Sequence, residues 1–400
     1  MPENAGGALG GIRVLDLGLL VQAPQAAQLL GDLGADVIKI ELPGVGDQSR
    51  WIPISLEDLR APYFVGCNRG KRSLTLDLRR TEGRDVLLRL VAKADVLVSN
   101  FVPGTLEGWG LDYETLAQHN PRLIAGYGSA FGPVGSDATR RGADLAGQAE
   151  GGLISTTGSS PDDGTPVGVT IADHIASQNL CNGILAALFA RERTGHGQKV
   201  EVSLVGGQLF AQCSELTASF LSGTQPDRAR GGHALIPMIY GIFATADGHI
   251  ALVGVVVPER KAFFDCIGRE DLAADERFAA PLFTDEVKRE LFDELARTFA
   301  THSSSHWAGR FDEGGFRYAR VRGYAEIKED PSLYENGYLQ RFDHPHWGPI
   351  SLVGCPIRLS RTPATPGTLA PELGQHSEEI LLESGYSWEE IAGLREAEVI

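Results

Sequence analysis

A single carboxylate separates a short apolar run from a long helical pattern within residues 167–204. Val167, Val169 and Ile171 alternate with small residues, which predicts a strand, and Asp173 then opens a helix with apolar residues at near-helical spacing. A second strand is predicted at residues 200–204. Ligands of open α/β sheets bind where a strand ends and a helix begins, which makes Asp173 a candidate site residue. Asp is also a common N-cap residue, so helix capping is the alternative role.

A second candidate is the basic segment at residues 68–73, just before an alternating strand pattern at 74–78. Arg69, Lys71 and Arg72 lie in it, and Arg79 follows the strand. The formal net charge of −16 excludes a general nucleic-acid surface, but a local patch of this kind can bind an anionic ligand. The alternative interpretation is a solvated strand edge.

Other catalytic patterns are absent from the sequence. The segment at residues 44–49 has Ser where a dinucleotide fingerprint needs its third Gly, and it follows the second predicted strand instead of the first. Residues 126–130 lack the glycines of a nucleophile elbow. The pairs His302/His306 and His344/His346 have no acidic or Cys partner at a metal-binding spacing. We therefore expect neither a metal nor a nicotinamide cofactor.

The N-terminal part of the chain alternates strand and helix patterns. Strands are predicted at 12–17, 36–41, 95–98 and 123–127, and helices at 23–33, 83–93 and 113–119. This rhythm predicts an α/β fold with a parallel sheet and right-handed crossovers.

At 400 residues the chain is long enough for two domains. Residues 222–228 are polar and rich in turn formers, and a hairpin pattern follows at 240–256 around an Asp-Gly turn. We predict a large domain whose N-terminal part is 1–224, a small inserted domain at 225–325, and a return to the large domain at 326–400. Residues 352–357 are expected to form a strand of the large domain.

The cysteines and the termini indicate a compartment. The five cysteines are scattered and form no CxxC pair, which is typical of reduced thiols. The N-terminus has no signal-peptide pattern, and the apolar runs are too short to span a bilayer. The expected location is cytoplasmic.

Several motifs together resemble one family, in the same order along nearly the whole chain. They are GIRVLDL at 11–17, LGADVIKIE at 33–41, NRGKRS at 68–73, ADVLV at 94–98 with NF at 100–101, TGHGQ at 194–198, GCPI at 354–357 and LGQH at 373–376. These segments resemble the class III CoA-transferases, which include formyl-CoA:oxalate and carnitine CoA-transferases and the related α-methylacyl-CoA racemases.

The resemblance implies a Rossmann-like large domain with a smaller inserted α+β domain and an interlocked homodimer. It implies transfer of CoA from an acyl-CoA to a free carboxylic acid through a covalent intermediate on an aspartate, which falls on Asp173. Asp144 would be a supporting acid, and Gln22 would lie near the thioester. CoA enters as part of the substrate, so no separate cofactor, nucleic acid or membrane is expected as a partner.

The resemblance also implies a set of CoA-binding positions. They are Ala23, Leu76, Asp77, Leu78, Arg79, Asn100 and Phe101. Basic residues that often occur in the family are replaced here by Leu42, Val102 and Gly108. We therefore expect Arg69, Lys71, Arg72, Arg79 or Arg141 to hold the CoA phosphates instead.

Two alternative functions remain open. An acyl-CoA racemase or epimerase needs two proton-transferring groups on opposite faces of the substrate, and Ala143 occupies the position of the family's His. A non-catalytic CoA-binding protein is the other alternative. For the acid itself, Arg141, Arg230, His233 and Tyr240 hint at a dicarboxylate such as succinate.

Overall fold

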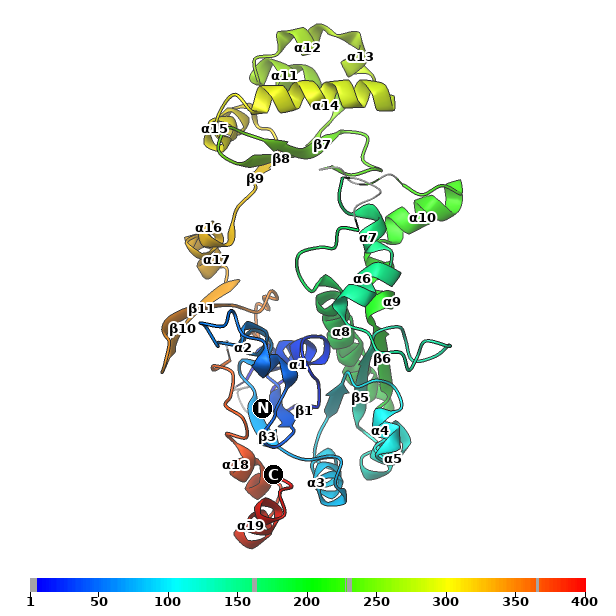
Figure 1. The fold of residues 1–400 in the computed structure, drawn as a ribbon, viewed down its shortest axis with the longest axis vertical. Helices are drawn as coiled ribbons and strands as arrows, with labels where there is room; N and C mark the ends of the chain where they lie inside the picture. The colour runs from blue at the N-terminus through cyan, green and yellow to red at the C-terminus, as the bar shows by residue number, and fades with distance from the viewer. Residues whose placement is uncertain (1–5, 160–163, 227, 229–231, 365–366) are drawn as a thin grey trace. The chain divides into compact units, whose positions relative to one another are not determined.

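The computed structural model describes residues 6–159, 164–226, 228, 232–364 and 367–400. The chain divides into two compact units (Figure 1). Unit 1 comprises Met1–Gly151, Gly168–Ala211 and Asp330–Ile400, and unit 2 comprises Gly152–Val167 and Gln212–Glu329. That residues 225–325 form a separate small domain that folds independently stays a prediction.

Unit 1 is built on a parallel sheet. Its strands are β1 (Arg13–Asp16), β2 (Asp36–Glu41), β3 (Arg72–Thr75), β4 (Val96–Ser99), β5 (Ile124–Ser129) and β6 (Lys199–Ser203). They form a six-stranded sheet in the order β3-β2-β1-β4-β5-β6, every neighbouring pair parallel. The predicted α/β fold with a parallel sheet is confirmed. This is the order of doubly wound folds, in which ligands bind at the carboxyl ends of the strands where the order reverses, here between β1 and β4.

Helices cover both faces of this sheet because neighbouring strand residues point to opposite sides. Val14 belongs to the core on one face, with α1 (Gln22–Asp32) and α8 (Ile171–Thr194), and Leu15 to the core on the other. The second core includes residues of α3 (Thr81–Val91), α5 (Tyr113–His119), α18 (Ser377–Glu383) and α19 (Trp388–Glu396). Helix α8 also packs on β5 and β6, which brings its N-terminus to the carboxyl end of the sheet.

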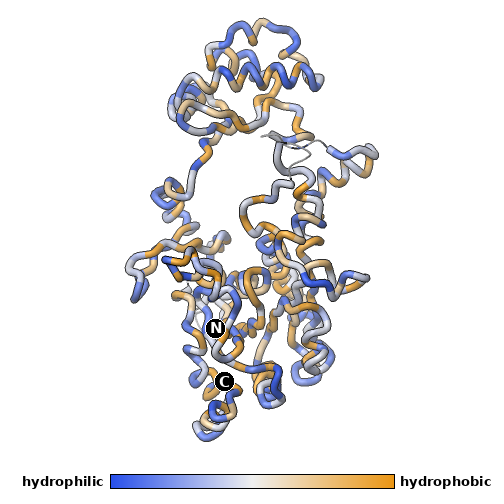
Figure 2. Tube along the Cα trace, in the orientation of Figure 1, coloured by the Kyte–Doolittle hydropathy of each residue, from blue (hydrophilic) through white to orange (hydrophobic). Residues whose placement is uncertain are grey.

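Unit 2 contains a three-stranded antiparallel sheet of β7 (Ile239–Ala244), β8 (His249–Val255) and β9 (Tyr318–Arg320). The β7–β8 pair confirms the hairpin predicted at 240–256. Aromatic side chains such as Phe263, Phe299 and Phe311 dominate the core between this sheet and its helices. In Figure 2, α14 (Asp285–Phe299) is mostly hydrophilic with hydrophobic residues at intervals, as expected for a helix that buries one side.

Two local predictions are wrong. Residues 167–170 are not in a strand, and α8 begins at Ile171. Of the segment 352–357, predicted as a strand of the large domain, only residues 352–353 lie in a strand, and that strand is separate from the six-stranded sheet. This strand, β11 (Gly348–Val353), pairs antiparallel with β10 (Leu339–His344) as a separate hairpin. Both errors arise because a short alternating run does not specify its partner.

The remaining short helices connect these elements. They are η1 (Gln48–Trp51), α2 (Pro62–Asn68), α4 (Thr105–Gly108), α6 (Asp144–Glu150), α7 (Leu153–Thr156), α9 (Leu204–Ala211), α10 (Cys213–Ser222), η2 (Val257–Glu259), α11 (Arg260–Cys266), α12 (Glu270–Ala274), α13 (Glu276–Ala279), α15 (Ser304–Gly314), α16 (Tyr324–Lys328) and α17 (Pro331–Glu335). Across the described ranges, every helix is too short or too polar to cross a bilayer.

Candidate active site

Asp173 lies in the first turn of α8, three residues after the N-cap residue Thr170. The cap is supplied from another helix. Asp144 Oδ1 accepts the main-chain N–H groups of Ala172 (2.7 Å) and Asp173 (3.2 Å), and Asp144 Oδ2 accepts a bond from Gln148 Nε2 at 2.7 Å. These bonds satisfy amide groups that a helix start leaves without partners. Asp144 therefore caps α8, and Asp173 does not.

The carboxylate of Asp173 is consequently left without a donor. Within the described part of the chain, no group hydrogen-bonds to its oxygens. Burial, and after it the negative charge of Asp144, raise the pKa of Asp173 to about 7. Near neutral pH both the acid and the carboxylate are therefore populated. A carboxyl group perturbed in this way is typical of a functional position.

Asp173 lines a pocket at the carboxyl ends of the strands, with an empty volume of about 480 Å³ that includes its open mouth. The pocket is also lined by Gln22, Asn100 and Phe101, three residues singled out from the sequence. Gln22 follows β1 and Asn100 follows β4, so the reversal point of the sheet brings them together with the start of α8. The fold thus brings Gln22, Asn100, Phe101 and Asp173 to one pocket, and their roles there stay a prediction.

Gln22 is held in the pocket wall by close packing. Its Nε2 donates to the main-chain oxygen of Ser129 at 3.3 Å, and its side chain lies over Gly128. A Cβ at Gly128 would lie 2.5 Å from Gln22 Cδ, so any larger residue there would force the Gln22 amide to move. The end of β5 therefore sets the position of Gln22.

The Asn100 side chain contacts the chain itself. Its Oδ1 accepts from Leu19 N and its Nδ2 donates to Leu19 O, both at 2.8 Å. This amide clamps the main chain between β1 and α1, so its two polar atoms are already engaged. Phe101 packs edge-on against Trp109, with ring centroids 5.7 Å apart.

The basic segment does not reach this pocket. Arg69 is buried, and its guanidinium pairs with both carboxylate oxygens of Asp32. Lys71 is buried too, and its Nζ donates to Asp16, Asn68 and the Pro24 carbonyl, each at 2.7 Å. Burial lowers the pKa of Lys71 to about 8 although Asp16 opposes the shift. The expectation that Arg69 and Lys71 meet CoA phosphates is not supported, because both serve as internal counter-ions.

Arg72 and Arg79 are also paired within the chain. Arg72 bonds to Asp36, Glu379 and Glu383, which ties α18 to the sheet edge. The exposed Arg79 binds Asp77 through two side-chain bonds of 2.8 and 2.7 Å. These contacts favour a structural role for Arg72 over phosphate binding.

The remaining predicted positions lie elsewhere. Leu76, Leu78 and Ala23 are buried in the core, and with Asp77 they lie outside the Asp173 pocket. Arg141 is exposed and does not line the pocket, and Arg230 lies outside the described residues. His233 and Tyr240 line a different pocket within unit 2.

Sequence reasoning missed Arg140, which does line the Asp173 pocket. Its guanidinium lies 3.8 Å from the centre of the Phe131 ring and pairs with Asp137 at 3.1 Å and with Glu150. The adjacent Arg141 was predicted instead, because a motif gives the position of a residue in the chain but not the direction of its side chain. Which of two neighbouring side chains points into a pocket depends on the backbone path.

His174 is a second residue that the sequence did not single out. Its Nδ1 lies 2.7 Å from Gln25 Oε1 and its Nε2 lies 3.2 Å from Thr170 Oγ1. Burial lowers the pKa of His174, while Asp144 opposes the shift. Both ring nitrogens are therefore engaged next to Asp173, and the imidazole is mainly neutral near pH 7.

Among the described residues, no three His, Cys, Asp or Glu side chains are grouped as a metal would require. The two histidine pairs pack against aromatic rings instead. His302 and His306 stack on each other at 4.1 Å beside Trp307, and His344 stacks on Trp347 at 3.7 Å.

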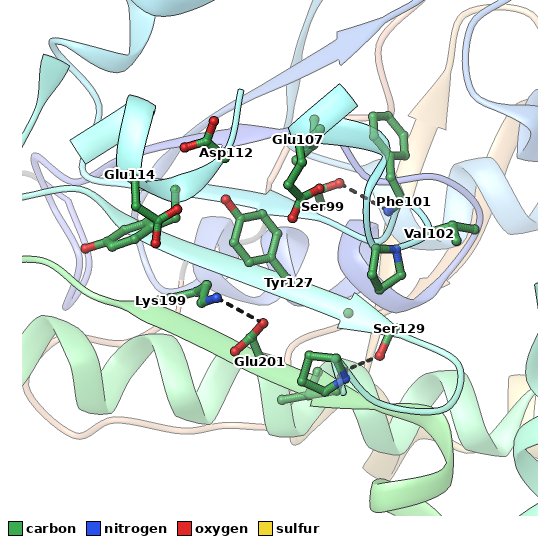
Figure 3. A pocket seen from close by; sticks show the side chains of 16 residues that line it. Ser99, Phe101, Val102, Glu107, Asp112, Glu114, Tyr127, Ser129, Lys199 and Glu201 are labelled. Carbon is green, nitrogen blue, oxygen red and sulfur yellow. Dashed lines mark hydrogen bonds and ion pairs between the residues drawn. The ribbon is translucent and has the colours of Figure 1, made fainter. Parts of the chain in front are cut away.

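A second pocket shares Phe101, Val102, Pro103 and Ser129 with the first (Figure 3). Its wall carries four carboxylate side chains and one lysine, namely Glu107, Asp112, Glu114, Glu201 and Lys199. The Tyr127 hydroxyl points among them and, within the described residues, has no hydrogen-bond partner. Burial, and then Glu107, raise the pKa of Tyr127. This pocket is too acidic to attract phosphate groups.

Comparison with known proteins places this geometry in context. The sequence model of "CoA-transferase family III" matches residues 9–377. The chain is 37% identical over 390 residues to the succinyl-CoA:mesaconate CoA-transferase of Haloarcula hispanica, covering 95% of this chain and 97% of the relative. It is 34% identical over 398 residues to the succinyl-CoA–D-citramalate CoA-transferase of Chloroflexus aurantiacus, covering 98% of each.

A solved structure is similar as well. The crystal structure of a CAIB/BAIF family protein from Brucella suis superimposes with a TM-score of 0.83 at 31% sequence identity. The match covers 95% of this chain and 100% of that one.

Proposed function

The chain belongs to CoA-transferase family III and is an enzyme of that family, and from this premise we propose that it moves CoA from an acyl-CoA thioester to a free carboxylic acid through a covalent intermediate on Asp173. The observation that carries the proposal is the carboxylate of Asp173. It lines a pocket, accepts no hydrogen bond from the described residues and has a pKa of about 7. A carboxylate that accepts no hydrogen bonds is a better nucleophile than a carboxylate that hydrogen bonds stabilise.

The transfer conserves the energy of the thioester in four steps. An Asp173 carboxylate oxygen attacks the thioester carbonyl, the C–S bond breaks, and CoA leaves as the thiolate while the acyl group stays on Asp173 as a mixed anhydride. The thiolate attacks Asp173 Cγ, which releases the donor acid as its carboxylate and leaves an aspartyl-CoA thioester. The acceptor carboxylate then displaces the thiolate from Cγ to form a second anhydride. Finally, the thiolate attacks the acceptor carbonyl, giving the new acyl-CoA and free Asp173.

The surroundings of Asp173 fit these steps. Each attack creates negative charge on an oxygen, and preorganised donors stabilise such charge best. The Gln22 amide lies over Gly128 and donates one N–H to Ser129 O, which leaves its second N–H at the pocket wall for the substrate. Arg140 also lines the pocket, and we propose that its guanidinium exchanges Asp137 or Glu150 for the carboxylate of an anionic acid. Water would hydrolyse either anhydride, so the working site must exclude it.

For the substrate we propose a dicarboxylic acyl-CoA such as succinyl-CoA as the donor. Two of the relatives named above carry succinyl-CoA in their names, and Arg140 can pair with a second carboxylate. Racemisation is less well supported because Ala143 replaces a histidine and both nitrogens of His174 are engaged.

We also propose an interlocked homodimer with a Rossmann-like large domain and a small domain at 225–325. Large apolar side chains are exposed in the single chain, including Leu56 (89%), Phe210 (74%) and Leu221 (84%). Exposed apolar surface of this kind typically marks an interface. Light scattering at micromolar concentration should give a dimer, and a monodisperse monomer would exclude the interlocked arrangement.

The direct test of the function offers succinyl-CoA together with a panel of isotope-labelled free acids. Mass spectrometry should find labelled acyl-CoA products and, after brief mixing with succinyl-CoA, a hydroxylamine-sensitive adduct on the peptide that contains Asp173. Deuterium incorporation at the α-carbon in heavy water, without any exchange of acids, would instead identify a racemase. Binding of CoA with neither reaction would identify a non-catalytic protein.

A further inference from the structure

The main-chain groups of three consecutive residues between β1 and α1, namely Gly18, Leu19 and Leu20, form hydrogen bonds with side chains. Gly18 N donates to Asp16 Oδ1 at 2.8 Å, and Gly18 O accepts from Lys39 Nζ at 2.8 Å. Leu19 is clamped through both its N–H and its carbonyl by Asn100, as described above. Loops are usually among the more mobile parts of a fold, so this density of side-chain bonds requires an explanation.

The third residue, Leu20, has an unusual backbone. Its φ angle is +63°, in the left-handed region that side chains with a Cβ rarely adopt. In the described part of the chain, Glu398 is the one other non-glycine residue with a positive φ. Leu20 lines the Asp173 pocket, and Gln22 follows two residues later. Strain of this kind persists only where surrounding contacts impose it, and it is typical of functional sites.

Asp47 supplies the contact that holds Leu20. Its Oδ1 accepts the Leu20 N–H at 3.0 Å and the Ser49 N–H at 2.8 Å. Its Oδ2 lies 2.9 Å from Lys39 Nζ, and both side chains are fully buried. Burial opposes ionisation of Asp47, but Lys39 and the two amide donors hold the pKa of Asp47 below its ordinary value. The same buried ion pair therefore fixes the segment at two points, Gly18 O and Leu20 N.

We propose that Asp47, a residue that does not line the Asp173 pocket, is a positioning residue for the active site. With Lys39 as its counter-ion, it keeps Leu20 in the left-handed conformation and thereby places Leu20 and Gln22 in the lining of the pocket that contains Asp173. The inference rests on the proposed function, since it assigns Asp47 a role in positioning residues of the Asp173 site.

The test compares Asp47→Asn with Asp32→Asn. Asn retains an acceptor oxygen but not the charge that pairs with Lys39. Asp32 is a matched control because it is also buried and ion-paired, with Arg69, but no contact joins it to residues 18–20. For each variant we would measure kcat and KM for CoA transfer, the melting temperature, and hydrogen–deuterium exchange of the peptide at residues 17–22.

Asp47→Asn should lower kcat by at least about tenfold, with a change in KM for acyl-CoA below about threefold, because misplaced groups affect the reacting geometry more than remote binding. The peptide at 17–22 should exchange faster. Asp32→Asn should leave kcat within about twofold even where it lowers the melting temperature equally. A kcat of Asp47→Asn within about twofold of wild type, or equal losses in both variants, would overturn the inference.

A second pair of variants covers the case in which Asp47→Asn does not fold. Leu20→Gly permits the left-handed conformation, and Leu20→Val disfavours it with a β-branched side chain. The valine variant should have a kcat at least about tenfold below that of the glycine variant, and equal values would contradict the proposal. Wild-type protein without any transfer activity would refute the proposed function itself, which separates the two failures.

Discussion

Asp144 accepts the main-chain N–H of Asp173 at 3.2 Å, while the carboxylate of Asp173 receives no hydrogen bond from the described residues. The Asp144 carboxylate, from α6, thus caps α8. The Asp173 carboxylate, in the first turn of α8, is left available and is close enough to be affected by the charge of Asp144. Asp144 contributes to the raised pKa of Asp173, after burial.

Asp173→Asn should reduce CoA transfer by more than about 10³-fold, the scale expected when a covalent nucleophile is lost. The fold should survive, because Asp144 and not Asp173 caps α8. Steady-state transfer rates and circular dichroism measure the two effects. The adduct on the Asp173 peptide should disappear in this variant and remain detectable in Asp144→Asn. Near-normal transfer by Asp173→Asn would rule out the covalent mechanism.

The pH dependence follows from the raised pKa of Asp173. The nucleophile is the ionised form, so the transfer rate at low acyl-CoA should rise through about pH 7. Asp144→Asn removes the neighbouring negative charge and should move this rise to lower pH. Glu192→Gln, at the far end of α8, is the control that should leave the profile unchanged. An unmoved profile in Asp144→Asn would exclude coupling between the two carboxyl groups.

The same pKa predicts a stability effect with a definite sign. The folded-state pKa of Asp173, about 7, lies above the ordinary aspartate pKa of 3.8. The acid form therefore stabilises the fold below about pH 4, and this contribution is lost as the pH rises through about 7. Thermal melts from pH 5 to pH 8 should show wild type losing stability relative to Asp173→Asn. A difference that is independent of pH would show that the carboxyl group titrates normally.

Gly128→Ala should damage the site without damaging the sheet. The added Cβ would overlap the Gln22 side chain and push it from the pocket wall. We expect kcat to fall by about tenfold or more, since small displacements of positioned groups are costly. Gly66→Ala, in α2 with nothing within 4 Å of its added Cβ, should retain full activity. Equal activity in the two variants would show that Gln22 is not needed.

Arg72→Ala should lower the melting temperature without changing KM, whereas Arg140→Ala should raise KM. Arg72 links Asp36 to Glu379 and Glu383 in α18, so its loss should lower the melting temperature and leave KM for acyl-CoA unchanged. The pairs are partly exposed, so each contributes about 1 kcal/mol or less. Arg140 lines the pocket, so its loss should raise KM. A raised KM in Arg72→Ala would restore its assignment to CoA phosphates.

The sequence by itself determined the elements and one central residue. Alternation of period two and helical spacing are local properties, so the parallel strands of unit 1 and the β7–β8 hairpin were predictable. The carboxylate at the start of a long helical pattern made Asp173 a candidate site residue with capping as the alternative, and its role as nucleophile, implied by the family resemblance, stays a prediction. The family motifs added Gln22, Asn100 and Phe101, which the fold brings to one pocket.

Only the tertiary structure decided how the charges are used. Asp144 lies 28 residues before the Ala172 amide that it caps, and Lys71 lies 55 residues after its partner Asp16. Sequence spacing carries no information about such pairs, because burial of both partners in one core selects them. For this reason the basic segment, which by composition suited phosphates, serves as internal counter-ions, and Arg140 in place of Arg141 lines the pocket. The clamp of Asp47 on Leu20 has the same origin, since a left-handed leucine is tolerated only where packing and buried bonds compensate for its strain.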